Sequence, residues 1–331
     1  MKRLSIAVLV LLSLLLTGCT QTATNKDDEL QPLYTQASEL LEKGDLQQAY
    51  DLFVQLGDYK DSAQHAEKFV YLPKEILAED DGFGEAIALF RTTFEYNENG
   101  QLLKEYGTYT NNEGPGYSEV NEYDKEGKVI LTKTESEAGF STITYEYNGD
   151  GQLIKRVGCT DGANVGGISV YEYDADGNCI RVSNKSYLGI DTETYESKEP
   201  YSTDTVEYTY NEQGLCTGSV NYYGDNSSVC TVEYTDSGLP TSIKIIYEDN
   251  SIGDAATFTY DEKGRCIKVE TSYNSTTEFT YDNGDLPVSA ITTRDGGKPC
   301  NVSYTYELYY VEGEKAAIPF HLEQYFSVLK V

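Results

Sequence analysis

The chain has no tryptophan, one methionine and only two histidines, His65 and His321, among its 331 residues. So few histidines leave little for a histidine-based zinc site or for a Ser-His-Asp triad. Cations are also scarce, since 25 lysines and arginines stand against 55 acidic residues, for a formal net charge of −30. Nucleic acids are polyanions held mainly by Lys and Arg, so this composition argues against a nucleic-acid partner.

The N-terminus carries a short apolar run that is preceded by Lys2 and Arg3. The run extends from Leu4 to Leu16 and falls short of the roughly 20 apolar residues of a transmembrane helix. A charged start, an apolar centre and a small-residue end are typical of a secretory signal peptide. The string Leu16-Thr17-Gly18-Cys19 resembles a bacterial lipobox, which implies cleavage after residue 18 and diacylation of Cys19.

This resemblance implies a location for the mature protein. Two acyl chains anchor a protein stably in a bilayer. We therefore expect residues 1–18 to be a removed signal peptide and the mature chain to lie on the extracytoplasmic face of a bacterial cell membrane, held there by Cys19. Residues 19–31 are polar and aperiodic in sequence, which predicts a flexible tether.

Residues 32–80 are predicted to form a short helical segment. Leu33, Ala37, Leu40 and Leu41 recur at three- and four-residue spacing, and Gly44 ends this first helix. Two further helices are expected, the third of them reaching Val70. The stretch "LLEKGDLQQAYDLFVQLGDYKDSAQHAEKF" resembles a tetratricopeptide-like hairpin, but stable arrays need about three repeats. A stalk or cap is therefore favoured here over a peptide-binding groove.

A tandem repeat begins near residue 86. Its members share an aromatic residue, a turn acid or amide and a glycine. They are FEYNENGQL (94–102), NEYDKEGKV (121–129), YEYNGDGQL (145–153), YEYDADGNC (171–179), YTYNEQGLC (208–216), VEYTDSGLP (232–240), FTYDEKGRC (258–266) and FTYDNGDL (279–286), with a turnless ninth, YTYELYY (304–310).

Each repeat predicts two strands joined by a tight turn. Alternating Thr, Glu, Tyr and Phe suit a strand. Asp or Asn followed three positions later by Gly suits a type I turn with a left-handed glycine, so we expect positive φ at Gly127, Gly177 and Gly264. In this register Tyr260 lies across from Cys266, and Phe258 across from Lys268.

The segments resemble the YD (RHS) repeat family, whose pattern runs Tyr-Asp-x-x-Gly-Arg-Leu; "YDEKGRC" and "YDADGNC" match it best. The resemblance implies a mainly β protein in which tandem YD-type hairpins over residues 86–311 form a long, curled antiparallel meander of roughly 16 strands. Residues 312–331 are expected to cap it. The large family members enclose toxins, but this chain shows no toxin domain, so that function is not carried over. Whether the sheet closes is left open.

Six cysteines remain beyond Cys19, and an even count in an exported chain suggests disulfides. However, Cys179, Cys216 and Cys266 occupy one repeat position that is Leu or Val in other units. Equivalent positions in successive hairpins lie two strands apart, nearly 10 Å, beyond the reach of a disulfide. Free, buried thiols are therefore favoured.

No cofactor, metal site or catalytic residue is expected. Asp174, Asp176 and Asn178 start like a calcium loop, yet positions six and twelve are Cys179 and Lys185 instead of Gly and Glu. A turn explains these residues better. None of the many carboxylates is singled out as half of a hydrolase pair, so the chain is predicted not to be an enzyme.

The leading functional hypothesis is a non-enzymatic lipoprotein whose repeat body binds a glycan or a protein. The alternatives are a structural spacer, a subunit docking through the helical segment and, less favoured, a hydrolase of an extracellular polymer. Binding is expected on the edge of variable turns, chiefly at the insertion over residues 183–205, which lengthens one repeat. The candidate binding residues there are Tyr187, Tyr195, Tyr201, Asp191 and Glu193.

Overall fold

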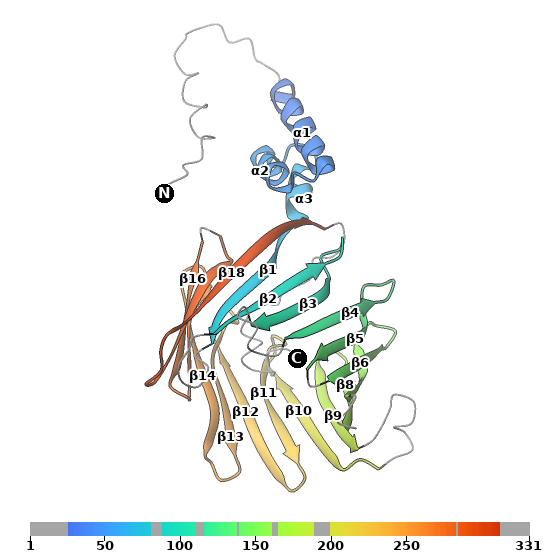
Figure 1. Cartoon of the computed structure of the whole chain (residues 1–331), viewed down its shortest axis with the longest axis vertical. Coiled ribbons are helices and arrows are strands. Elements are labelled where there is room, and N and C mark those ends of the chain that lie inside the picture. Colours follow the sequence, from blue (N-terminus) through green and yellow to red (C-terminus); the bar gives the residue numbers. More distant parts are fainter. Residues whose placement is uncertain are drawn as a thin grey trace. The chain divides into compact units, whose positions relative to one another are not determined.

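A computed structural model describes residues 26–80, 88–109, 116–137, 139–160, 165–188, 199–282 and 284–311. The signal peptide, Cys19 and the expected cap over 312–331 lie outside these residues. The chain divides into two compact units at Phe69, a helical unit before it and a β unit after it (Figure 1). None of the described helices is long and apolar enough to cross a membrane.

The helical unit contains α1 (Lys26–Lys43), α2 (Leu46–Leu56) and α3 (Ser62–Glu67). Its core is built around Phe53, which is fully buried together with Ala37 and Ala49. The ring of His65 stacks on that of Phe53, with centroids 4.6 Å apart. The Tyr34 hydroxyl donates to Asp61 at 2.5 Å and lowers the pKa of that carboxyl group.

Two boundaries of the predicted helical region are wrong. The expected tether is helical from Lys26, because the acids at positions 27–29 lie in the first turn, where they favour the helix dipole. At the other end, residues 69–80 form strand β1 (Phe69–Asp80) instead of continuing the helical segment. Pro73 does not disturb this strand's pairing with its neighbour, since the register begins at Glu75.

The β unit is a single antiparallel sheet of 18 strands. The strands after β1 are β2 (Ala88–Tyr96), β3 (Leu102–Tyr109), β4 (Tyr117–Tyr123), β5 (Val129–Ser136), β6 (Gly139–Tyr147), β7 (Leu153–Thr160), β8 (Val165–Tyr173), β9 (Cys179–Leu188), β10 (Ser202–Tyr210), β11 (Cys216–Tyr223), β12 (Asn226–Tyr234), β13 (Pro240–Tyr247), β14 (Ile252–Tyr260), β15 (Cys266–Thr271), β16 (Ser275–Tyr281), β17 (Pro287–Arg294) and β18 (Cys300–Tyr310).

The sheet closes on itself, so the expected curled meander, whose closure the sequence left open, is a closed ring. Consecutive strands pair around the ring, and β1 pairs with β2 on one side and β18 on the other (Figure 1). Glu79 of β1 accepts hydrogen bonds from the Asn301 backbone N–H and side-chain amide of β18, at 3.0 and 2.6 Å. The repeats alone did not predict closure, because the strand that joins the two ends lies before the first repeat.

The acid or amide of each motif holds the tight turn. In the best-matching repeat, the Asp261 N–H donates to the Arg265 carbonyl oxygen, and the Gly264 N–H donates to the Asp261 carbonyl oxygen. Asp261 Oδ1 also accepts the N–H groups of Lys263 and Arg265, both at 2.9 Å. Gly127, Gly177 and Gly264 have φ of 82°, 90° and 80°, which confirms the expected left-handed position.

The tyrosine directly before each motif turn, with its counterpart Tyr306 in the turnless ninth motif, is here called the anchor tyrosine. In eight of the nine motifs it completes the pairing between neighbouring hairpins. The Tyr260 hydroxyl donates to the carbonyl oxygen of Pro240 at 2.7 Å, while the ladder between β13 and β14 starts only at Ser242. The hydroxyl thus caps a carbonyl that lies beyond the end of the backbone ladder. Seven further tyrosines make the same bond at 2.6–2.9 Å: Tyr123, Tyr147, Tyr173, Tyr210, Tyr234, Tyr281 and Tyr306.

One register prediction needs correction. Tyr260 pairs with Cys266 as expected, but Phe258 pairs with Val269, and Lys268 lies opposite Thr259. A bulge shifts the register between Thr259 and Tyr260, which leaves one extra residue in β15. Similar shifts follow the other motif turns, for example between Glu146 and Tyr147.

The two faces of the sheet differ in burial. The tyrosine face, which carries the anchor tyrosines, includes Ile243 and Val269 at 0% and 1% exposure, whereas Lys244 and Thr257 on the other face are exposed. Burial over β11 to β17 therefore identifies the tyrosine face as the one that the closed sheet encloses, although the other face also has a small buried cluster of Val157, Ile168 and Tyr187 between β7 and β9. The apolar core of the tyrosine face spans β11 to β17 and includes Cys216, Cys230 and Cys266.

Cys179, Cys216 and Cys266, which share one repeat position, are buried and form no disulfide, as favoured from the sequence. Burial raises the pKa of Cys230 and of Cys266 to about 11. At neutral pH these thiols are protonated, and they pack as small hydrophobic side chains.

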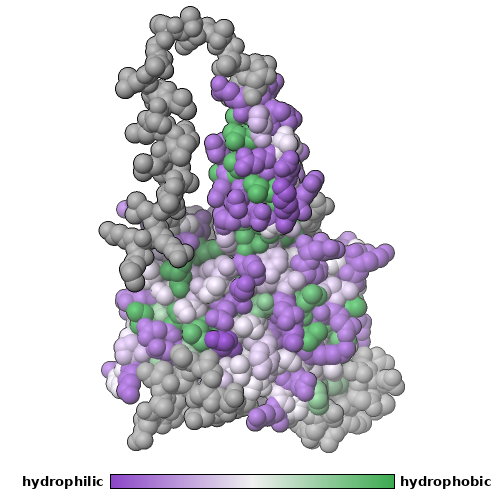
Figure 2. Space-filling view, turned by 45° about the horizontal axis from the view of Figure 1, so that its top comes forward, coloured by the Kyte–Doolittle hydropathy of each residue, from purple (hydrophilic) through white to green (hydrophobic). Residues whose placement is uncertain are grey.

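The opposite face, here called the glutamate face, carries cross-strand ion pairs. Lys155 pairs with Glu146 at 3.0 Å and Arg181 with Glu207 at 2.5 Å. Hydrophilic side chains are interspersed with small hydrophobic groups over the side of the sheet visible in Figure 2. Exposed ion pairs add little stability, so the enclosed face is the main source of stability.

Candidate functional site

The two edges of the sheet differ as the sequence predicts. The motif turns all lie at one edge, and the variable connections, which join odd-numbered strands to the following even-numbered ones, lie at the other. Four tyrosines stand at or beside these variable connections, and we call them the tyrosine edge. They are Tyr201, Tyr223, Tyr247 and Tyr273, with exposed fractions of 60%, 49%, 49% and 74%.

Two of these tyrosines are held in place by their neighbours. A Cβ on Gly253 would lie 2.6 Å from the Tyr247 ring, so the missing side chain lets the ring rest on the backbone. The Asp254 carboxylate beside the Tyr273 hydroxyl raises the pKa of Tyr273, and burial and Tyr247 add smaller contributions. Exposed aromatic rings beside carboxylates suit contact with a sugar or a protein surface.

The structure places the described residues of the predicted insertion site differently from one another. β9 and β10, which flank the insertion, pair without interruption, and the Tyr201 N–H donates to the Ser186 carbonyl at 2.9 Å, so the sheet is not broken there. Tyr187 does not project from it. It belongs to β9, is 5% exposed and packs with Val157 and Ile168 on the glutamate face.

The other candidate binding residues fall into two groups. Of the described ones, Tyr201, which directly precedes β10, is the most exposed to solvent, at 60%. Asp191, Glu193 and Tyr195 lie outside the described residues. The structure thus brings Tyr201 into the tyrosine edge and takes Tyr187 out of any exposed site.

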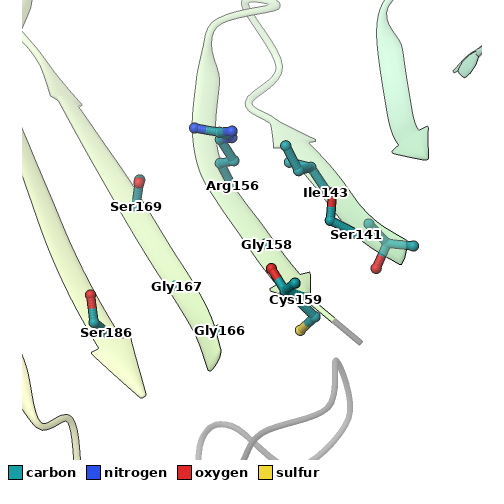
Figure 3. A pocket seen from close by; sticks show the side chains of 11 residues that line it. Ser141, Ile143, Arg156, Gly158, Cys159, Gly166, Gly167, Ser169 and Ser186 are labelled. Atoms are coloured by element: carbon teal, nitrogen blue, oxygen red, sulfur yellow. The ribbon is translucent and has the colours of Figure 1, made fainter. Parts of the chain in front are cut away.

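A second surface feature is a hollow of about 310 Å³ on the tyrosine face between β6 and β9. Its floor is a directly paired row of four residues, Ile143, Gly158, Gly167 and Ser186. The next row contains Arg156 and Ser169, also directly paired. Figure 3 shows these residues on neighbouring strands, with Ser141 on the far side.

The hollow is polar. Arg156 is its one charged lining residue among those described, and no carboxylate lines it. The Arg156 side chain is exposed and lies near enough to Glu119 to lower the pKa of that carboxyl, although burial and Glu105 raise that pKa more strongly. Within the described residues no ion pair includes Arg156.

The carboxylate oxygens of the acidic turns accept hydrogen bonds from backbone N–H groups. Asp174 Oδ1 accepts the N–H groups of Asp176 and Asn178 at 3.0 and 2.8 Å. The Asn178 side chain is the largest cause of the lowered pKa of Asp174, followed by these N–H groups. The described residues contain no group of three or more potential metal ligands.

Sequence reasoning missed the tips at Tyr223, Tyr247 and Tyr273 and also the hollow. The sequence does indicate these three tyrosines, since "NYYGDN", "IYEDNS" and "SYNS" each place a tyrosine at a variable turn. The glycines of the hollow are also unusual in the sequence, because glycine is rarely favoured inside a strand. Only the register shows that Gly158 and Gly167 face each other.

Tyrosine-capped hairpins with Asx-Gly turns define a β protein of the YD-repeat class. The chain belongs to the Teneurin YD-shell family, whose model matches residues 84–293, more than half of the chain. Membership of this family indicates a shell-like β protein.

Solved structures show distant similarity. A porin-like protein from Bacteroides uniformis is 14% identical with a TM-score of 0.41, covering 71% of this chain and 98% of its own. One from Bacteroides vulgatus is 12% identical with a TM-score of 0.38, covering 72% and 99%. TcdB2-TccC3 without its hypervariable C-terminal region is 14% identical with a TM-score of 0.30, and the match covers 66% of this chain but only 13% of that one. No curated protein matches the chain.

Proposed function

We propose that this protein is a lipid-anchored, extracytoplasmic binding protein whose YD-repeat sheet takes a glycan or a protein partner along the tyrosine edge. Exposure of Tyr201, Tyr223, Tyr247 and Tyr273 on one edge is the observation that carries this proposal. Tyrosine offers a large, rigid contact surface at low entropic cost. The connections at this edge vary without disturbing the sheet, as binding loops do.

Charge favours the same edge. Glu248, Asp249 and Asp254 lie near Tyr247 and Tyr273. Carboxylates accept hydrogen bonds from sugar hydroxyls and pair with basic groups of a protein. A neutral glycan or a basic protein surface therefore fits the edge better than an acidic protein.

A double substitution tests the edge. Wild-type protein and a Tyr247→Ala, Tyr273→Ala variant are compared on a glycan array and in a pull-down. Tyr106→Ala is the matched control, because Tyr106 is 45% exposed on the glutamate face. We expect the double variant to lose at least about tenfold in affinity while the control binds normally. Equal binding by all three proteins would rule out the tyrosine edge, and an absence of any ligand would favour a spacer.

The membrane anchor is tested separately. Lipidation of Cys19 predicts that Cys19→Ala abolishes labelling by a fatty-acid probe and releases the protein from the membrane fraction. Continued labelling of the variant would contradict the anchor.

A further inference from the structure

The hollow between β6 and β9 contains two glycines that packing does not explain. A Cβ on Gly158 would meet Ile143 at 3.8 Å, and one on Gly167 would meet the Lys185 carbonyl at 3.8 Å, both ordinary contacts. Neither glycine has positive φ. By contrast, a Cβ on Gly218 would lie 2.3 Å from the Cys230 carbonyl oxygen, so sterics require that glycine.

Paired glycines in the middle of a sheet weaken it, because glycine loses much entropy on folding and offers no side chain to pack. A glycine inside a strand often marks a place where a ligand or another backbone comes close. Here the two glycines face each other across β7 and β8 and form the floor of the hollow. Their missing side chains create its volume, which lies at the lower end of the range for small-molecule sites.

The groups around this floor determine the chemistry of a ligand. Arg156 presents N–H donors to the hollow, and its guanidinium has no ion-pair partner among the described residues, although the protein carries a formal charge of −30. Arginine pairs with carboxylates in a two-pronged geometry. The hydroxyls of Ser141, Ser169 and Ser186 border the same space (Figure 3) and are both donors and acceptors.

We propose that the hollow binds a small ligand with a carboxylate beside several hydroxyl groups, of the acidic-sugar class. Arg156 pairs with the carboxylate, the three serine hydroxyls bond to the ligand's hydroxyls, and the sugar ring lies over Gly158 and Gly167. The hollow shares no residue with the tyrosine edge, so each proposal stands or falls without the other.

The access route follows from the strand ends. Thr160, which lines the hollow, is the last residue of β7, and Gly166 is the second residue of β8. The hollow therefore lies next to the edge of variable connections, and Arg156 remains exposed there. We therefore place the entry of the proposed ligand at that edge.

The test uses D-glucuronate as the probe. Its binding to the full-length protein is measured by saturation-transfer NMR and calorimetry. D-glucose has the same ring without the carboxylate, and acetate has the carboxylate without the hydroxyls. We expect glucuronate to bind at least roughly tenfold more tightly than either. Similar affinity for glucose or acetate, or no binding of glucuronate at about 10 mM, would overturn the proposal.

Three variants localise the binding. Arg156→Gln should weaken glucuronate roughly ten- to a hundredfold and leave glucose unchanged. Arg181→Gln removes the same charge from the glutamate face and should keep the wild-type affinity. Gly167→Val fills the floor and should abolish binding without lowering the melting temperature, because its Cβ meets no close contact. Wild-type affinity in Arg156→Gln or in a folded Gly167→Val would place the ligand elsewhere.

Discussion

Removal of one tyrosine hydroxyl tests the hairpin caps. In Tyr260→Phe the ring still packs against the core, but the Pro240 carbonyl loses its 2.7 Å hydrogen bond. Loss of one such hydrogen bond lowers the free energy of unfolding by about 1 kcal/mol, and by more where water does not reach the unpaired carbonyl oxygen. For a domain of this size, about 1 kcal/mol lowers the melting temperature by about 2–4 °C.

A matched control separates the cap from the loss of any hydroxyl. Tyr106 is 45% exposed on the glutamate face, and its hydroxyl makes no hydrogen bond within the described residues, so Tyr106→Phe should melt at the wild-type temperature. Tyr147→Phe, which removes the cap on Val129, should add to Tyr260→Phe because the two sites share no partner. Calorimetry checks both expectations. Equal shifts in Tyr260→Phe and Tyr106→Phe would refute the capping role.

Three further predictions follow from the turns, the thiols and the buried phenols. Gly264→Val should cost more than about 1 kcal/mol, because φ is +80° there; an unchanged melt would contradict the turn assignment. Iodoacetamide at about pH 8 should label half-buried Cys159 and Cys300 well before buried Cys179, Cys216, Cys230 and Cys266, and mass spectrometry of partly labelled protein should show that order; early labelling of the buried four would be inconsistent with the described core. Burial raises the pKa of Tyr281 to about 12, above its unfolded value, so its contribution to stability is complete below about pH 10 and lost as pH rises towards 12; urea titrations should give a stability that falls over this range and a shallower fall in Tyr281→Phe.

The repeats predicted most of the β unit because the interactions of each repeat are local in the sequence. Asp261, Gly264 and Tyr260 form their bonds within one hairpin or with the hairpin before it, so a single motif specifies both turn and cap. The bulge next to Tyr260 escaped prediction, since the motif shows the turn but not the extra residue in the following strand. Residues 69–80 were assigned to the helical segment because Phe69 and Val70 continue the apolar spacing of the third helix.

The sites were harder to predict because they depend on neighbours far apart in the sequence. Tyr187 lies in an unusual insertion yet is buried by Val157 and Ile168, a contact that sequence spacing does not reveal. Gly158 and Gly167 form a floor only through the pairing of β7 with β8. The variable edge was predicted correctly as a property of the repeat, and of the exposed tyrosines on it the sequence singled out only Tyr201.

Closure of the sheet through β1 is the central structural claim, because it defines the enclosed face and the edge on which both proposed sites lie. Hydrogen exchange followed by mass spectrometry measures it directly on the peptides that cover β1 and β18. The account predicts that amides of both strands exchange as slowly as those of β12 and β13, since each strand is paired on two sides. Fast exchange in β1 and β18 would show an open sheet with two free edges and would contradict the account.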